Sequence, residues 1–277
     1  MSPDRSRPGF DPHHRLPGTI NFRDLGGYTT ADGGHIKTGR LFRSGHLAYA
    51  EAESQVHIAA LNIELVCDFR SDAEREEHPN HYADGHSPFL KPLPIWPIKT
   101  PGVDNTVARL LQGEIDLATA LSDQTAAYRE FVREQSAQFA GMFNAILERE
   151  YPGVLLHCSA GKDRTGIASA LLLTALDVSF DDVRHDYLMS KDGHGAIAQT
   201  QFYVDKYWGA YKDAFGTEPA CSQADVHQLF SVQPIKIDAA FDEMKKMSSS
   251  ADGYLSDVLG LTRDRRDTLK RRYIKTP

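Results

Sequence analysis

Two kinds of hydrophobic pattern alternate along the chain. Short apolar runs bounded by polar or turn-forming residues predict buried strands. The clearest begin at Ile63 and Val154, and each ends at a polar segment, as a strand does before a functional loop. The run that begins at Phe89 contains prolines, which favour the edge of a sheet. The expected strands are residues 19–22, 35–42, 63–67, 89–95 and 154–156.

Longer segments carry apolar residues at helical spacing. Tyr128, Val132, Phe139, Phe143 and Leu147 predict the core-facing side of a long helical region that ends near residue 150. Ser71 is placed to cap a short acidic helix. The other expected helices are residues 47–61, 72–77 and 165–176, with more helix in 190–250. Strands that alternate with helices favour an α/β fold, a sheet covered by helices.

The 277 residues fit one large domain with an insertion better than two equal domains, because domains cluster at roughly 100–200 residues. Residues 1–16 are polar and proline-rich, and we expect them to form a flexible tail. Residues 17–277 then form the single domain. Within it, residues 190–250 are rich in polar and aromatic side chains and are expected to make a helical lid or cap.

Charge and hydropathy narrow the possible partners. The formal net charge of -7 argues against general binding to nucleic acid or anionic membranes, although a few local cations can still hold an anionic substrate. No run approaches the ~20 apolar residues that span a bilayer, and residues 1–18 lack the apolar stretch of a signal peptide. We expect a cytoplasmic protein without an integral membrane segment. Secretion without a cleaved signal stays open.

The chain has three widely spaced cysteines and no Cys-x-x-Cys pair. This spacing predicts neither a disulfide framework nor a zinc site, and it favours a reducing compartment. Cys67 ends a strand and is expected in the core, where oxidation could join it to Cys158.

One loop carries the candidate chemistry: His157-Cys158-Ser159-Ala160-Gly161-Lys162-Asp163-Arg164-Thr165-Gly166. It lies between an apolar strand and an apolar helix, so its backbone N–H groups and the helix N-terminus can surround one anion. Gly161 permits an unusual backbone angle, and Arg164 offers a planar fork to two phosphoryl oxygens. In this cradle Cys158 is stabilised as a thiolate, the nucleophilic form. The pattern predicts a cysteine-dependent phosphatase that forms a phosphocysteine.

The residues expected to bind phosphate are Ser159, Ala160, Gly161, Lys162, Asp163, Arg164 and Thr165. The Thr165 hydroxyl is also placed to help the sulfur leave in the second step. A nucleotide-binding P-loop does not fit, because Asp163 stands where Ser or Thr is required and Leu156 stands at the first glycine position.

The loop resembles that of the cysteine-based protein tyrosine phosphatase superfamily, in the version found in bacterial atypical dual- or triple-specificity phosphatases. Three further segments resemble that group: Asn21-Phe22-Arg23-Asp24-Leu25-Gly26-Gly27-Tyr28; Asp68-Phe69-Arg70-Ser71 with Glu74; and Tyr254-Leu255 with Leu259-Gly260-Leu261. The resemblance implies a mostly parallel four- to five-stranded sheet flanked by helices, a helical lid, and no metal or organic cofactor. The implied substrates are phosphotyrosine, phosphoserine or phosphothreonine in proteins, and phosphoinositides.

The general acid has two candidates. Many tyrosine phosphatases carry an Asp after Trp-Pro, but here Trp96-Pro97 is followed by Ile98. The resemblance gives the acid role to Asp163, inside the loop. Asp68, at a strand end, is the alternative; it could instead cap the next helix or orient Arg164.

Four other residues have two interpretations each. Lys162 either recognises a second phosphate, as in phosphoinositides, or balances the charge of Asp163. His157 is expected to hydrogen-bond the loop rather than act as a base. Arg23 and Asp24 are expected to form an ion pair, which either supports the site or is purely structural.

Two other functions compete with phosphate ester hydrolysis. One is a phosphate-binding module without activity, although Cys158, Asp163 and Arg164 are all present. The other is a sulfurtransferase or arsenate reductase, which can also use a cysteine loop followed by arginine. Lys162, Asp163 and the segment near residue 21 speak against that second alternative.

Overall fold

The computed structural model describes residues 14–95 and 105–276. Most of the expected tail, and the Trp96-Pro97-Ile98 segment, lie outside these ranges. Leu16, inside them, is buried against the core.

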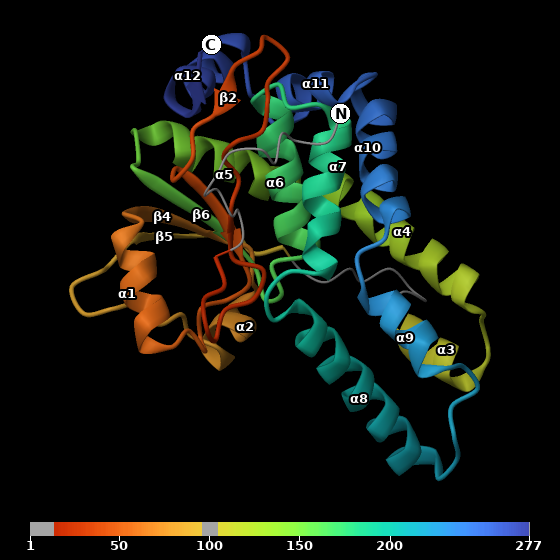
Figure 1. Ribbon diagram of the computed structural model, residues 1–277. Helices are drawn as coiled ribbons and strands as arrows, with labels where there is room; N and C mark the ends of the chain where they lie inside the picture. Colours follow the sequence, from red (N-terminus) through yellow and green to blue (C-terminus); the bar gives the residue numbers. More distant parts are fainter. Residues whose placement is uncertain (1–13, 96–104, 277) are drawn as a thin grey trace.

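The centre of the fold is a five-stranded sheet with the order β1-β3-β6-β4-β5 (Figure 1). Strands β3, β6, β4 and β5 are parallel, and β1 pairs antiparallel with β3. The expected fold class is therefore confirmed, including the edge position of β5. The strands are β1 Arg23–Asp24, β3 Leu41–Ser44, β4 Ile63–Asp68, β5 Phe89–Pro92 and β6 Gly153–His157.

Two expected strands differ from the structure for a backbone reason. Asn21 has a φ of 56°, so residues 19–22 cannot continue as a strand, and pairing begins at Arg23. Gly39 has a φ of 72° and divides the expected strand 35–42 in two. Its first part, β2 (His35–Ile36), pairs instead with the C-terminal β7 (Ile274–Lys275).

The helices cover both faces of the sheet and extend beyond it. The expected capping of α2 is confirmed: Ser71 and Glu74 form a capping box. The expected helix 47–61 begins only at Ala52, because the backbone of Glu51 before it is extended (φ -69°, ψ 159°). The helices are α1 Ala52–Ala60, α2 Asp72–Glu77, α3 Thr106–Gln112, α4 Leu117–Glu134, α5 Ser136–Glu148, α6 Asp163–Ala175, α7 Phe180–Leu188, α8 Ala196–Phe215, α9 Gln223–Phe230, α10 Pro234–Ser248, α11 Ala251–Gly253 and α12 Arg263–Tyr273, with short 3-10 and π turns at Met189–Lys191 and Tyr254–Val258.

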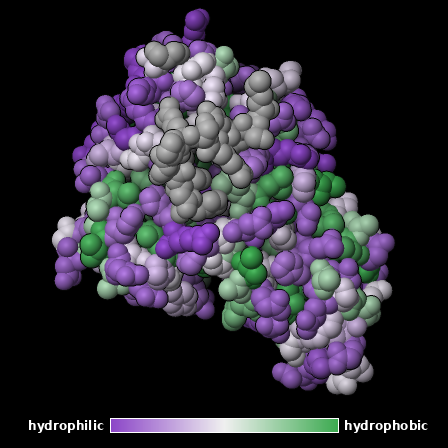
Figure 2. Space-filling model, in the orientation of Figure 1, coloured by the Kyte–Doolittle hydropathy of each residue, from purple (hydrophilic) through white to green (hydrophobic). Residues whose placement is uncertain are grey.

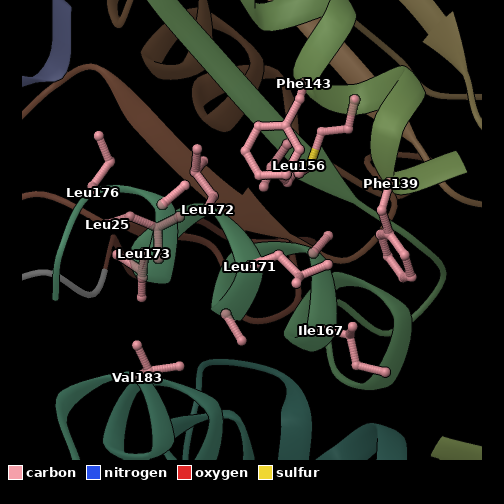
Figure 3. Packing of buried hydrophobic residues seen from close by; sticks show 14 of the residues in the cluster. Leu25, Phe139, Phe143, Leu156, Ile167, Leu171, Leu172, Leu173, Leu176 and Val183 are labelled. Carbon is pink, nitrogen blue, oxygen red and sulfur yellow. The ribbon is translucent and has the colours of Figure 1, made fainter. Parts of the chain in front are cut away.

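Alternate residues of β6 enter two separate cores. Leu156 packs with Phe143 of α5 and Leu171 of α6 in the larger core (Figure 3). Leu155 faces the other way, into the smaller core beside α1 that contains Phe42. Because both faces of the sheet are covered, the loop after β6 leaves a strand that is buried throughout.

Residues 190–250 divide into two parts. Helix α10 packs on α4 and α7, and its Ile237 and Met244 belong to the larger core. Helix α8 projects away from the sheet and lies beside α3 and α9 (Figure 1). Whether this segment works as a lid stays a prediction.

The surface seen in this orientation is mainly hydrophilic, with hydrophobic residues in several separate patches (Figure 2). In the described part of the chain, no helix combines the length and apolar character that crossing a membrane requires.

Candidate active site

The loop between β6 and α6 lies at the carboxyl end of the central strand. Cys158 follows β6 directly and is 1% exposed. Gly161 has a φ of 65°, and a Cβ there would collide with the backbone of Ser44 and Gly45. Glycine is therefore required at this position for two reasons, the backbone angle and the close approach of the loop to β3.

Three successive carbonyl groups of the loop are held from outside. Each accepts a hydrogen bond from a separate part of the N-terminal third of the chain. Ser159 accepts from the N–H of His46 (3.0 Å), Ala160 from Asn21 Nδ2 (3.0 Å) and Gly161 from Arg43 Nη2 (2.8 Å).

These bonds determine where the loop N–H groups point. In a trans peptide the N–H of the next residue points opposite to the carbonyl, and the described residues contain no cis peptide. The N–H groups of residues 160–162 are thus turned to the other side of the loop. Within the described part of the chain, none of the N–H groups of residues 159–165 donates to another protein group. The loop presents a ring of free donors suited to one anion.

Arg164, at the start of α6, is fixed by a carboxylate on α2. Its two terminal nitrogens each lie 2.7 Å from an oxygen of Glu74. Burial raises the pKa of Glu74, but the hydrogen bonds and charge of Arg164 outweigh it and lower that pKa to about 2. The bond to Glu74 likewise raises the pKa of Arg164 despite burial. The Nε of Arg164 makes no hydrogen bond to the described residues, so a donor remains for a ligand.

Glu74 also binds the loop itself. Ser159 donates its hydroxyl hydrogen to Oε1 of the same carboxylate, 2.5 Å away. Because Glu74 also completes the capping box with Ser71, one side chain joins the start of α2, the loop and Arg164.

Asp163 lies beside Arg164, and its side chain is 35% exposed. The hydroxyl of Tyr128 donates to Asp163 and lies 2.7 Å from the hydroxyl of Tyr187. Lys162 Nζ lies 3.6 Å from the carboxylate. Burial raises the pKa of Asp163, but Lys162, Lys236 and the Tyr128 hydrogen bond outweigh it and hold that pKa below its usual range.

Two lysines bind the end of α9: Lys162 of the loop and Lys236 of α10. Lys162 donates to the Phe230 carbonyl, and Lys236 donates to the Leu229 and Ser231 carbonyls at 2.9 and 2.8 Å. Burial lowers the pKa of Lys236 to about 7. Three consecutive carbonyl groups at a helix C-terminus thus receive cationic donors, the favourable arrangement for the helix dipole.

Asp68 ends β4, in register with His157 of β6, and is 0% exposed. Arg70 binds both its oxygens, and Nε2 of His157 lies 3.3 Å away. Burial raises the pKa of Asp68, but His157 and Arg70 outweigh it and hold that pKa well below its usual range. Nδ1 of His157 lies 3.2 Å from the Cys158 carbonyl, so this histidine bridges the strand end and the loop.

The expected ion pair between Arg23 and Asp24 is wrong. Neighbouring residues of a strand point to opposite faces, so the two side chains separate. Arg23 Nε lies 3.0 Å from Asp186 on α7. Asp24 accepts from the N–H groups of Gly26 and Gly39 at 2.7 and 2.6 Å, and burial raises its pKa to about 6.

Thr165 is fully buried, and its hydroxyl has no hydrogen-bond partner in the described part of the chain. The expected bond from this hydroxyl to sulfur is absent from the structure, so that role stays a prediction. Among residues 14–95 and 105–276, no group of three His, Cys, Asp or Glu side chains is placed to hold a metal ion.

Sequence reasoning missed Arg43 and the polar role of Tyr128. Arg43 stands in the buried strand Leu41–Ser44, where a charged side chain is itself a signal. Tyr128 fits the apolar face of α4, and its ring does pack in the core, but its hydroxyl reaches Asp163.

Comparisons with known proteins give several similarities. A family model described as the tyrosine phosphatase family matches residues 14–275. A protein of Cupriavidus necator, whose name assigns it provisionally to the tyrosine-protein phosphatases, is 32% identical over 244 residues, 86% of this chain and 81% of that one. The triple specificity protein phosphatase PtpB of Mycobacterium tuberculosis is 32% identical over 195 residues, 64% of this chain and 68% of that one. Among solved structures, TpbA of P. aeruginosa aligns over 78% of this chain and 99% of its own, at 16% identity and a TM-score of 0.31.

Proposed function

Because the chain belongs to the tyrosine phosphatase family, we propose that it hydrolyses phosphate monoesters through a phosphocysteine formed on Cys158. The observation that carries this proposal is the loop after β6. Its carbonyl groups are bound from outside, and its N–H groups have no partner among the described residues. Its cysteine directly follows β6, and its arginine lies in the first turn of α6. Such a site stabilises the charge on the phosphoryl oxygens, where most of the catalysis of phosphoryl transfer arises.

In the first step the Cys158 thiolate attacks phosphorus. The S–P bond forms as the P–O bond to the leaving group breaks, and the leaving oxygen takes a proton from Asp163. The free N–H groups of residues 159–165 and the guanidinium of Arg164 bind the three phosphoryl oxygens.

In the second step water attacks the phosphocysteine. Asp163, now ionised, accepts a proton from the water, and the S–P bond breaks to release inorganic phosphate and the thiolate. The Thr165 hydroxyl, which is buried and free, is the donor proposed to stabilise the departing sulfur.

Asp163 fits the acid role better than Asp68. The Asp68 carboxylate is 0% exposed and is occupied by Arg70 and His157. Asp163 is partly exposed beside the loop and is held by Tyr128. The dianion of a bound substrate adds negative charge next to Asp163, which favours its protonated form.

For substrates, we propose phosphotyrosine together with phosphoserine, phosphothreonine and phosphoinositides. Lys162 supports the last group, because it adds a second cation to the loop, 3.6 Å from Asp163. To bind a second phosphate its ammonium group would exchange the Phe230 carbonyl for the ligand. Lys162→Gln is expected to lower phosphate release from phosphatidylinositol phosphates more than release from a phosphotyrosine peptide. No release from any inositol lipid by the wild type would contradict this.

The lid role is proposed for α8 and α9. Tyr203 and Tyr207 of α8 stack on Phe230 of α9, at ring distances of 5.6 and 5.3 Å. Burial raises the pKa of Tyr203, and the negative charge of Glu74 adds to the effect. The carbonyl of Phe230 in turn binds Lys162.

A substrate panel with wild type, Cys158→Ser and the matched control Cys221→Ser tests the function. Cys221 lies between α8 and α9, outside the loop. Wild type and Cys221→Ser should release phosphate, and Cys158→Ser should not. Equal phosphate release by Cys158→Ser would overturn the proposal. Thiocyanate formation or arsenate reduction without phosphate release would favour the alternative functions.

A further inference from the structure

A buried polar cluster lies directly beneath the loop. It consists of Arg23 (β1), Arg43 (β3), Asp186 (α7) and Ser190, and we call it the Arg43 cluster. Arg43 Nη1 lies 2.5 Å from one Asp186 oxygen, and Arg23 Nε lies 3.0 Å from the other. The Ser190 hydroxyl accepts from both arginines, at 3.1 and 3.2 Å.

The cluster carries a net positive charge that water does not screen. Arg23, Arg43 and Ser190 are 0% exposed, and Asp186 is 2% exposed. Two guanidinium groups face one carboxylate, so one positive charge is left uncompensated within the cluster. A buried charge without a partner is strongly destabilising, so the excess charge of the cluster calls for another partner.

Two tyrosines of the described chain also interact with Arg43, but they do not supply that negative charge. Burial raises the pKa values of Tyr28 and Tyr187 well above 10, so both are neutral. Burial and Arg23 lower the pKa of Arg43 to about 10, which leaves it cationic at neutral pH. The remaining partner is Cys158, whose anionic form favours the charged form of Arg43.

The same arginine fixes one peptide of the loop. Arg43 Nη2 lies 2.8 Å from the Gly161 carbonyl oxygen. Because that peptide is trans, holding the oxygen toward Arg43 turns the N–H of Lys162 toward the opposite side, where an anion would bind.

We propose that Arg43 is a positioning residue for the hydrolytic reaction: it orients the Gly161–Lys162 peptide, and its buried charge stabilises the Cys158 thiolate and the bound phosphoryl group from below. This inference rests on the proposed function. It adds a second arginine, which never touches substrate, to the one in the loop.

Three variants separate the charge of Arg43 from its hydrogen bonds. Arg43→Met removes both, Arg43→Lys keeps the charge, and Asp186→Asn makes the cluster more positive. The readouts are the pH dependence of kcat/KM for p-nitrophenyl phosphate and the pH dependence of Cys158 alkylation by iodoacetamide, located by mass spectrometry. The second readout does not require activity.

Arg43→Met is expected to lower kcat/KM at least about tenfold and to move the acid limb of both profiles upward by about one pH unit, the effect of one nearby charge. Arg43→Lys should restore the acid limb to near its wild-type position. Asp186→Asn should move it to lower pH. If the role of Arg43 were purely structural, the variants would lose thermal stability. The acid limb would then not move to higher pH in Arg43→Met and to lower pH in Asp186→Asn.

An acid limb that stays at the wild-type pH in Arg43→Met would overturn the inference. If that variant does not fold, Asp186→Asn decides, and an unchanged or raised limb there would also overturn it. The proposed function fails separately, if wild type and Cys158→Ser release phosphate equally.

Discussion

The carboxylate of Glu74 holds both terminal nitrogens of Arg164 at 2.7 Å. The two residues come from different helices, and their bidentate geometry fixes the plane of the guanidinium before any ligand is present. The position of α2, which is set by its capping box, therefore determines the orientation of the arginine in the loop.

Glu74→Gln should weaken catalysis by releasing Arg164. A neutral amide retains one acceptor oxygen but loses the charge and the second acceptor, so the guanidinium gains freedom. We expect kcat/KM to fall by roughly 10- to 100-fold, the range typical of a misplaced catalytic group. Steady-state kinetics with an aryl phosphate measures this. Glu77→Gln, at the exposed end of the same helix, is the control and should match wild type.

The same carboxylate makes stability depend on pH. The pKa of Glu74 falls from an ordinary 4.5 to about 2 in the folded protein. Its stabilising contribution is therefore complete above about pH 4.5 and is lost as pH falls toward 2. The difference in urea midpoint between wild type and Glu74→Gln should shrink over that interval. A difference in urea midpoint that stays constant over this pH interval would show that the charge of Glu74 does not contribute to stability.

Asp163→Asn should depress turnover strongly for esters with poor leaving groups and much less for activated aryl esters. An acid is needed only where the leaving oxygen is basic. The alkaline limb of the kcat profile, which we assign to loss of the Asp163 proton, should also disappear. Asp68→Asn should instead lower thermal stability and keep the limb, because Asp68 is buried between Arg70 and His157. Unchanged turnover of both ester types by Asp163→Asn would remove Asp163 from the mechanism.

Gly161→Ala should distort the backbone of the loop after β6. The alanine would have to adopt a φ of 65° at a cost of about 1–2 kcal/mol, and its Cβ would also strike the backbone of Ser44 and Gly45. We expect activity to fall by at least about 100-fold, as for a site displaced by an ångström. Gly209→Ala, in α8 with open space around it, is the matched control and should keep full activity. Equal activity of both variants would mean that the loop tolerates displacement.

The sequence predicted correctly those elements that depend on residues close together in the chain. Strand β4, the capping of α2 and the loop after β6 depend on short apolar runs, one serine and one glycine within a few residues. The alternation of strands and helices also indicated an α/β fold, and the family resemblance implied that its sheet is mostly parallel.

The support of the loop could not be predicted in the same way. Arg43 binds Asp186 across 143 residues, and the choice of Asp186 rather than Asp24 as the partner of Arg23 depends on which face of β1 each side chain occupies. The division of strand 35–42 depends on the backbone angle of Gly39, which a strand-like pattern of side chains does not reveal. Contacts between distant segments require the folded arrangement.

The most direct test of the mechanism is to stop the reaction in acid during turnover and to weigh the peptide that contains Cys158. Wild type, and especially Asp163→Asn, in which breakdown of the intermediate should be slow, is expected to carry one phosphoryl group on that cysteine. Cys158→Ser should carry none and release no phosphate. Steady release of phosphate by the wild type with Cys158 never modified at any reaction time would contradict the account.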